Sequence, residues 1–206
     1  MKLTVPDMSL VVLVGASGSG KSTFARTHFA PTQVLSSDFF RGLVADDEND
    51  QSASADAFDT LHYVAGKRLA AGRMTVIDAT NVQRASRASL VKLAKEHDVL
   101  PTAIVLDLPI AVCAARNASR PDRDFGDHVV RRQRGELQRS LKSLEREGFR
   151  RVHVLRGEAE VAEAEIVFEP LRNDKRALTG PFDVIGDVHG CEIGRASCRE
   201  RVCLLV

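Results

Sequence analysis

The sequence predicts an α/β fold in which a parallel sheet carries helices on both faces. Short apolar runs alternate with longer segments of helical spacing, an arrangement that is typical of successive β-α-β units. Of the 206 residues, 44% are hydrophobic and 28% are charged, which are ordinary values for a folded globular domain. The length is sufficient for one full domain and part of a second.

Each predicted strand is a run of mainly Val, Leu, Ile and Ala that ends in polar residues or glycine. We expect strands at 10–15, 32–38, 74–81, 102–109 and 151–157, and a weaker sixth strand at 164–171. We expect helices between them at 21–29, 55–71, 84–97, 110–119 and 127–147. The polar stretch 45–56 is assigned no role.

Composition and charge exclude some classes of protein. The net charge is +1, so the chain as a whole has no strong attraction to nucleic acid or to a membrane. No run approaches the roughly 20 apolar residues that a membrane-spanning helix needs. Cys113 is the only cysteine before residue 190, so no disulfide framework is visible and we expect a cytoplasmic protein.

The segment 15–23 reads GASGSGKST and fits the pattern G-x4-G-K-[ST] of a phosphate-binding loop, or P-loop. In such a loop, glycines let backbone N–H groups turn toward a phosphate. The lysine neutralises β- and γ-phosphate oxygens, and the following hydroxyl binds Mg²⁺. A tight glycine turn with an incidental lysine is the alternative, but it would not explain the predicted strand before the loop and the helix after it.

These features predict a P-loop NTPase-type parallel sheet flanked by helices, with ATP and Mg²⁺ as its ligands. The residues of the loop that we expect to bind ATP are Gly15, Ser17, Gly18, Ser19, Gly20, Lys21, Ser22 and Thr23. Ser22 is also a predicted ligand of Mg²⁺.

Two polar residues follow the second predicted strand, at the end of the sheet where ligands bind in open parallel sheets. Asp38 stands at the tip of this strand and Arg41 follows three residues later. If a helix starts here, the two side chains are neighbours on one face. The carboxylate can accept the proton of an incoming hydroxyl, and the arginine can hold a phosphate of the acceptor. The alternative role for Asp38 is that of a helix N-cap.

The third predicted strand ends in Asp78, which we expect to reach Mg²⁺ through water. The competing interpretation is an Asp that merely forms a turn. Asp107, at the end of the fourth predicted strand, is an alternative residue for the same role.

Arginines follow the fourth predicted strand. Arg116 and Arg120 are four residues apart on one predicted helix, and Pro121 should end that helix before the next begins. Two jointed helices that carry arginines on one face suit a helical lid that clamps phosphates. Eleven of the 22 arginines lie between 116 and 156, and a solvated helical face is the other explanation of that cluster.

The P-loop, the Asp38-x-x-Arg41 pair, the sequence DATN at 78–81 and the arginine-bearing lid occur here in an order that resembles the kinase module of bacterial polynucleotide kinase-phosphatases. These enzymes heal RNA ends, and the phage polynucleotide 5′-kinases are also similar. The resemblance covers about residues 8–170. It implies transfer of the ATP γ-phosphate to the 5′-hydroxyl of an RNA or DNA end in nucleic-acid repair.

The resemblance also implies roles for individual residues. Asp38 would be the general base, and Arg41 would hold the phosphate on the 3′ side of the terminal nucleoside. Lys21 and Arg116 would stabilise the donor phosphates, with help from Arg120. The expected catalytic residues are therefore Asp38, Lys21, Arg41 and Arg116.

Members of this family continue into a metallophosphoesterase domain. The expected division of the chain is a P-loop kinase domain at 1–170, a linker at 171–181, a truncated start of the phosphoesterase at 182–191 and a tail at 192–206. Asp187 and His189 stand in metal-ligand positions, but the remaining ligands of a two-metal site are missing, so we expect no phosphatase activity. The tail resembles read-through of cloning sequence, and we expect it not to be native.

Two other functions fit parts of the pattern. One is a P-loop kinase for a small molecule, and the other is a non-catalytic nucleotide-binding module. Asp38 argues against the module, because a switch does not need a carboxylate that activates a hydroxyl. Family resemblance further implies a homo-oligomer and, as a partner, an RNA methyltransferase of a repair operon.

Overall fold

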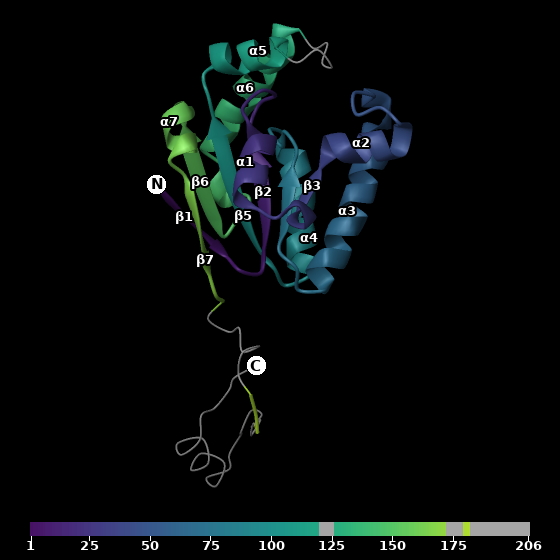
Figure 1. The fold of residues 1–206 in the computed structure, drawn as a ribbon, viewed down its shortest axis with the longest axis vertical. Coiled ribbons are helices and arrows are strands. Elements are labelled where there is room, and N and C mark those ends of the chain that lie inside the picture. Colours follow the sequence, from purple (N-terminus) through teal and green to yellow (C-terminus); the bar gives the residue numbers. More distant parts are fainter. Residues whose placement is uncertain (120–125, 172–178, 182–206) are drawn as a thin grey trace. The chain divides into compact units, whose positions relative to one another are not determined.

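The computed structural model describes residues 1–119, 126–171 and 179–181. The chain divides into two units, Met1–Glu169 and Pro170–Val206. In the first unit, five parallel strands form one sheet in the order β3-β4-β2-β5-β6, with helices packed against it (Figure 1). This arrangement confirms the predicted fold class. The segments predicted as a phosphoesterase start and a non-native tail lie outside the described residues.

The elements follow one another as the alternation of apolar and helical segments predicts. The strands are β1 (Lys2–Pro6), β2 (Ser9–Val14), β3 (Val34–Ser36), β4 (Thr75–Asp78), β5 (Leu100–Asp107), β6 (Arg151–Arg156) and β7 (Glu165–Glu169). The helices are α1 (Lys21–His28), α2 (Ser37–Ala45), α3 (Ser54–Ala70), α4 (Arg84–Glu96), α5 (Ile110–Ala118), α6 (Asp127–Leu141) and α7 (Gly157–Ala162). The described ranges also contain three 3₁₀ turns: η1 (Pro31–Gln33), η2 (Gln51–Ala53) and η3 (Leu144–Arg146).

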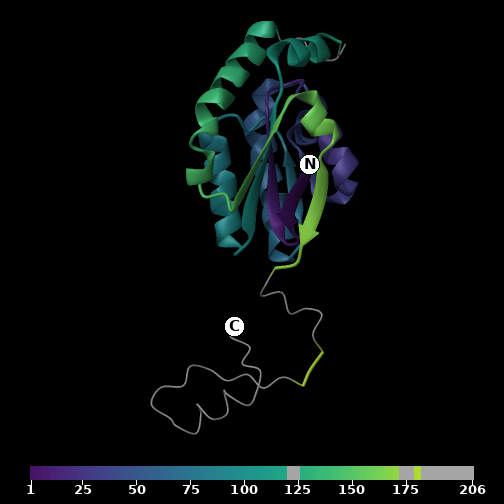
Figure 2. The same ribbon diagram turned by 90° about the vertical axis from the view of Figure 1, so that its left-hand side faces the viewer.

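The central strand β2 is buried along its whole length, because both faces of the sheet are covered. Its side chains alternate between two apolar clusters. Leu10, Val12 and Val14 pack in the cluster that includes α3 and α4, whereas Val11 and Leu13 pack in the cluster that includes α1 and β1. Figure 2 shows the sheet nearly edge-on, with α6 on one side and β7 on the other.

The sequence analysis did not predict β1, whereas the weaker sixth strand that it expected is present as β7. The two strands pair in parallel as a separate two-stranded sheet, from Lys2↔Glu165 to Pro6↔Glu169. The weaker predicted sixth strand therefore does not extend the main sheet. Leu3 and Val5, which alternate with other residues along β1, are fully buried.

Helix boundaries also differ from the prediction. The helix expected at 127–147 ends at Leu141, and the chain continues into η3. Between the second predicted strand and the helix expected at 55–71, the nine-residue helix α2 begins directly after the short strand β3. None of the helices in the described ranges is long and apolar enough to cross a membrane.

A buried ion pair fixes the segment that follows β4. The Arg87 guanidinium on α4 donates to both carboxylate oxygens of Glu147, at 2.7 and 2.8 Å, and its side chain is fully buried. The same guanidinium donates to the carbonyl oxygens of Asn81 and Val82, each at 2.8 Å. These four bonds hold the chain after Asp78 against α4 and the residue that follows η3.

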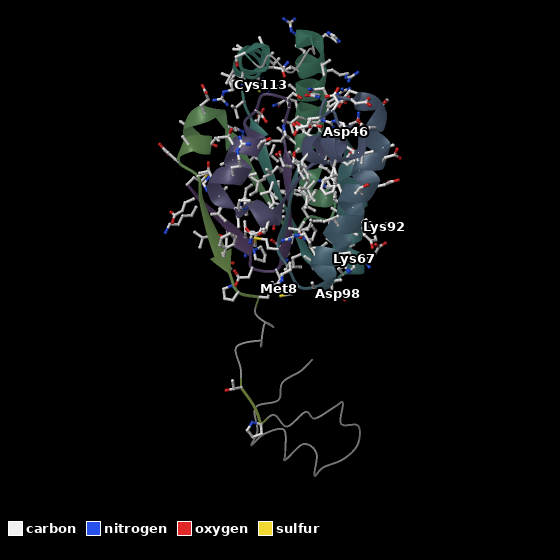
Figure 3. All side chains as sticks on the ribbon, turned by 45° about the vertical axis from the view of Figure 1, so that its right-hand side comes forward. Met8, Asp46, Lys67, Lys92, Asp98 and Cys113 are labelled. Atoms are coloured by element: carbon white, nitrogen blue, oxygen red, sulfur yellow. The ribbon has the colours of Figure 1, made fainter. Side chains whose placement is uncertain are left out.

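The two ends of the sheet carry different segments. Figure 3 labels Met8 and Asp98, which precede β2 and β5, at one end of the molecule's folded body. It labels Cys113 on α5 and Asp46, at the end of α2, toward the opposite end. Helices α2 and α5 therefore lie at the carboxyl ends of the strands, where ligands bind in open parallel sheets.

Candidate functional site

The P-loop connects β2 to α1, and two of its glycines have backbone angles that favour glycine. Gly18 has φ 78° and Gly20 has φ 89°. A Cβ atom on Gly18 would lie 2.2 Å from the carbonyl oxygen of Cys113, so the loop packs directly against the backbone of α5. Any side chain at position 18 would separate the loop from this helix.

Lys21 lies across the start of the loop. Its ammonium donates to the carbonyl oxygens of Gly15, at 2.9 Å, and Ala16, at 2.8 Å, and the residue is only 8% exposed. The ammonium is therefore held beside the backbone of the loop, where its positive charge would attract a bound polyphosphate.

A cavity of about 960 Å³ opens beside the loop. The P-loop residues that line it, which we call the donor wall, are Ser17, Gly18, Ser19, Gly20, Lys21, Ser22 and Thr23. Gly15, the remaining residue predicted for the loop, is buried and does not line the cavity. Its N–H group donates to the carbonyl oxygen of Thr80, and this bond joins the start of the loop to the segment that follows β4.

Asp38 and Arg41 line the same cavity. They lie in α2, where the Arg41 guanidinium forms an ion pair with the Asp38 carboxylate. The cap of α2 is Ser36, whose Oγ accepts from the N–H of Phe39, so Asp38 is in the first turn and is not the N-cap. Arg41 Nε also donates to the carbonyl oxygen of Glu48, at 2.8 Å. Burial lowers the pKa of the Arg41 guanidinium, against the raising effect of Glu48 and Asp47.

The two predicted ligands of Mg²⁺ both face the cavity. Asp78 ends β4, is 5% exposed and lines the cavity together with Ser22. A carboxylate and a hydroxyl are suitable oxygen ligands for Mg²⁺, which in such sites takes its other ligands from phosphates and water. In the described ranges, no group of three or more His, Cys, Asp and Glu side chains could hold a metal on its own.

Asp107, the alternative to Asp78, has another role in the structure. Its Oδ1 accepts hydrogen bonds from the guanidinium of Arg134 and from Gln138 Nε2, at 2.8 Å for the latter. It does not line the cavity. The carboxylate at the end of β5 therefore anchors α6 instead of facing the P-loop.

Arg116 projects from α5 to the rim of the cavity. Its side chain is 45% exposed and pairs with Glu158 on α7, which also lines the cavity. Arg116 Nη1 would lie 3.4 Å from a Cβ atom on Gly20, so the guanidinium is beside the donor wall. Arg120, predicted as its helper, lies outside the described residues.

Burial shifts the pKa values of two groups, one on α5 and one at the end of α1. Burial raises the pKa of the Cys113 thiol, although Lys21, Arg134 and Arg116 oppose this effect. Burial also lowers the pKa of His28, which lines the cavity at the end of α1. Both groups are thus neutral at pH 7 and add no charge to the site.

The sequence reasoning missed a second wall of the cavity. Gln51, Ser54 and Phe58, from η2 and α3, line it together with Asp38 and Arg41, and we call these five residues the acceptor wall. The first three are spaced by three and four residues, so they share one helical face. This spacing could have indicated that the three side chains face the same site. The stretch 45–56 was assigned no role because it is polar, so the spacing was not considered. Three further lining residues come from α6: Val129, Arg132 and Gln133.

Comparisons with known proteins agree with this fold. A family model described as AAA domain matches residues 10–146. No curated protein sequence matches the chain. A chain of the Pnkp1/Rnl/Hen1 RNA repair complex is 24% identical with a TM-score of 0.59, over 68% of this chain and 47% of that chain. The protein thus spans about half the length of that neighbour.

Two further solved structures are similar. A Chloroflexus aurantiacus protein described as a kinase candidate is 16% identical with a TM-score of 0.55, over 74% of this chain and 86% of that chain. A chain of the PezAT toxin–antitoxin system of Streptococcus pneumoniae is 15% identical with a TM-score of 0.53, over 75% of this chain and 70% of that chain. At such identities the likeness shows the fold alone, which is a kinase-like P-loop fold.

Proposed function

The chain belongs to the AAA domain family, and on that premise we propose that it is an ATP-dependent polynucleotide 5′-hydroxyl kinase. The observation that supports this most is that Asp38 lines the same cavity as the P-loop. A carboxylate that faces the phosphate-binding loop across a cavity is suited to accept a proton from a hydroxyl between them. Arg41, paired with Asp38, supplies a positive charge for a phosphate of the acceptor.

In the proposed reaction, Asp38 takes the proton of the acceptor 5′-hydroxyl, whose oxygen attacks the γ-phosphorus of ATP while ADP leaves. Lys21 and Arg116 stabilise the negative charge that develops on the transferred group. Ser22 and Asp78 would hold Mg²⁺, which when bound offsets charge on the phosphates. The RNA-repair setting, a homo-oligomer and a methyltransferase partner belong to the same proposal and rest on the sequence resemblance.

One observation favours a small-molecule acceptor instead. Arg41 is held by the carbonyl oxygen of Glu48 in a loop that also contains Asp46, Asp47 and Asp50. Four acidic residues beside the acceptor wall would repel a polyanion at low salt. A kinase for a compact, uncharged alcohol is therefore the second candidate function.

The choice of acceptor is tested by incubating the protein with γ-labelled ATP, Mg²⁺ and one of three acceptors. These are a 5′-OH oligonucleotide, the same oligonucleotide with a 5′-phosphate, and a mixture of small polyols and neutral sugars. We expect label only in the 5′-OH oligonucleotide, and none in any acceptor with Lys21→Ala. Label in the small alcohols but not in the oligonucleotide would refute the proposal and establish the second candidate.

A further inference from the structure

Helix α6 forms a hydrogen bond to the P-loop through the side chain of Gln133. The backbone N–H of Ser17 donates to Gln133 Oε1 at 2.8 Å, across 116 positions of sequence. Ser17 is 4% exposed, and Gln133 lines the cavity. The bond joins the start of the donor wall to a helix that the sequence motif of the loop does not include.

The place of Gln133 is fixed by its neighbours on α6. Arg134 and Gln138 donate to Asp107 at the end of β5, at 3.1 and 2.8 Å. Val130 and Leu137, one turn before and one turn after, are buried in the two apolar clusters. Polar anchors and buried side chains on adjacent turns hold the helix in one position, so Gln133 approaches the loop from a rigid element.

The chemistry of a carboxamide determines which of its atoms remains for a ligand. A glutamine side chain has one acceptor oxygen and two N–H donors on its nitrogen. Because the Ser17 N–H can only bond to an acceptor, the oxygen is assigned to Ser17. The two N–H donors on the nitrogen of the same planar group are therefore left for a ligand. Gln133 and the P-loop line the same cavity, so that ligand can be a phosphate bound by the loop.

The position of Lys21 indicates which phosphate these donors would meet. The Lys21 ammonium bonds to the carbonyl oxygens of Gly15 and Ala16, the two residues that precede Ser17. The lysine of this motif serves the β- and γ-phosphates. Gln133 thus reaches the end of the loop where the terminal phosphates are bound, whereas Thr23 lies at the other end.

We propose that Gln133 is a ligand of the donor γ-phosphate: its Nε2 donates to a γ-phosphate oxygen while its Oε1 remains on the Ser17 N–H. This assignment rests only on the ATP-binding half of the proposed function. It holds for any acceptor, and so it also stands if the acceptor is not a polynucleotide.

The test is the affinity of purified protein for ATP and for ADP, measured by calorimetry with Mg²⁺ and without acceptor. Gln133→Met removes both the donors and the acceptor at similar volume. We expect it to weaken ATP binding about 10- to 100-fold, the usual loss for a hydrogen bond to a charged group, and to change ADP binding about twofold or less. Equal weakening of ATP and ADP would refute a contact with the γ-phosphate.

A second variant tests whether Gln133 binds the phosphate or only stabilises the loop through its bond to the Ser17 N–H. Gln133→Glu keeps an oxygen for the Ser17 N–H but replaces the donors with negative charge, so we expect ATP binding at least as weak as in Gln133→Met. ATP binding at the parent level in Gln133→Glu would show that only the bond to Ser17 matters. This variant also decides the question if Gln133→Met does not fold.

The matched control is Gln33→Met. Gln33 Oε1 accepts from the backbone N–H of Ala30 at 3.0 Å, which is the same type of bond, and Gln33 does not line the cavity. We expect unchanged affinity for both nucleotides. A loss of ATP affinity in Gln33→Met equal to that in Gln133→Met would contradict the proposal, because the effect would then not be specific to the loop.

Discussion

The donor wall and the acceptor wall line one cavity, but they are built in different ways. The donor wall is a run of seven successive residues, 17–23, whose shape is set by Gly18 and Gly20. The acceptor wall gathers residues from α2, η2 and α3, and it exists only because α2 packs on α3. A local motif is therefore enough to identify the donor wall, whereas the acceptor wall depends on tertiary packing that a short pattern does not contain.

The largest expected effect concerns the framework that both walls share. Arg87→Met leaves the Glu147 carboxylate, 3% exposed, without its guanidinium partner. Removal of one partner of a buried pair typically costs about 3–5 kcal/mol of the free energy of unfolding, measured by urea denaturation. The control is Lys92→Met, at a position of the same helix where the side chain is 79% exposed. Equal stability of the two variants would show that the buried pair does not hold the segment after β4.

The next largest effect is expected from a substitution in the donor wall. Lys21→Met removes the charge inside the loop, so we expect the rate of phosphate transfer to fall about 10²- to 10³-fold. Lys67→Met is the control, since the Lys67 ammonium lies 5.2 Å from the centre of the Tyr63 ring on α3, away from the loop. Transfer by Lys21→Met at the rate of the control would contradict the role of the donor wall.

A smaller effect is expected at the acceptor wall. Phe58→Ala removes a half-buried ring from a residue that lines the same cavity as Asp38. If a nucleobase stacks there, the KM for the oligonucleotide should rise about 10- to 100-fold, while the affinity for ATP stays the same. Tyr63→Ala, 66% exposed on the same helix, is the control. A change in ATP affinity equal to the change in KM would contradict the claim that Phe58 serves acceptor binding and not ATP binding.

The smallest effect concerns pH. Burial would raise the pKa of Glu147, but its hydrogen bonds to Arg87 and Ser143 bring it below the ordinary value of 4.5. A carboxylate with a lowered folded-state pKa adds stability above its unfolded pKa, and this stability is lost as the pH falls through the folded value. The stability difference between the parent and Glu147→Gln should therefore shrink from pH 6 to pH 3. A difference that stays constant over this range would contradict the pairing.

The sequence was sufficient for the main sheet and for the donor wall. Strand-helix alternation predicted the parallel sheet, and the spacing of Gly20, Lys21 and Ser22 placed the loop at a strand-helix junction. Both signals are local, because periodicity and loop motifs need only neighbouring residues.

The remaining features depend on contacts between distant segments. β1 pairs with β7, more than 160 residues away, and neither strand indicates its partner. Asp107 resembles Asp78 in sequence, as a carboxylate at a strand end, yet it bonds to Arg134 and Gln138 on α6. Only the packing of α6 decides which carboxylate faces the cavity.

The role of Asp38 is tested most directly by the single-turnover rate of phosphate transfer in Asp38→Asn, with ATP affinity measured on the same preparation. The control is Asp59→Asn, at an exposed position of α3 that does not line the cavity. We predict a rate about 10²- to 10⁴-fold below that of the control, with unchanged ATP affinity, because a general base is lost while the donor wall is intact. An Asp38→Asn rate equal to that of the control would contradict a cavity in which this carboxylate activates the acceptor.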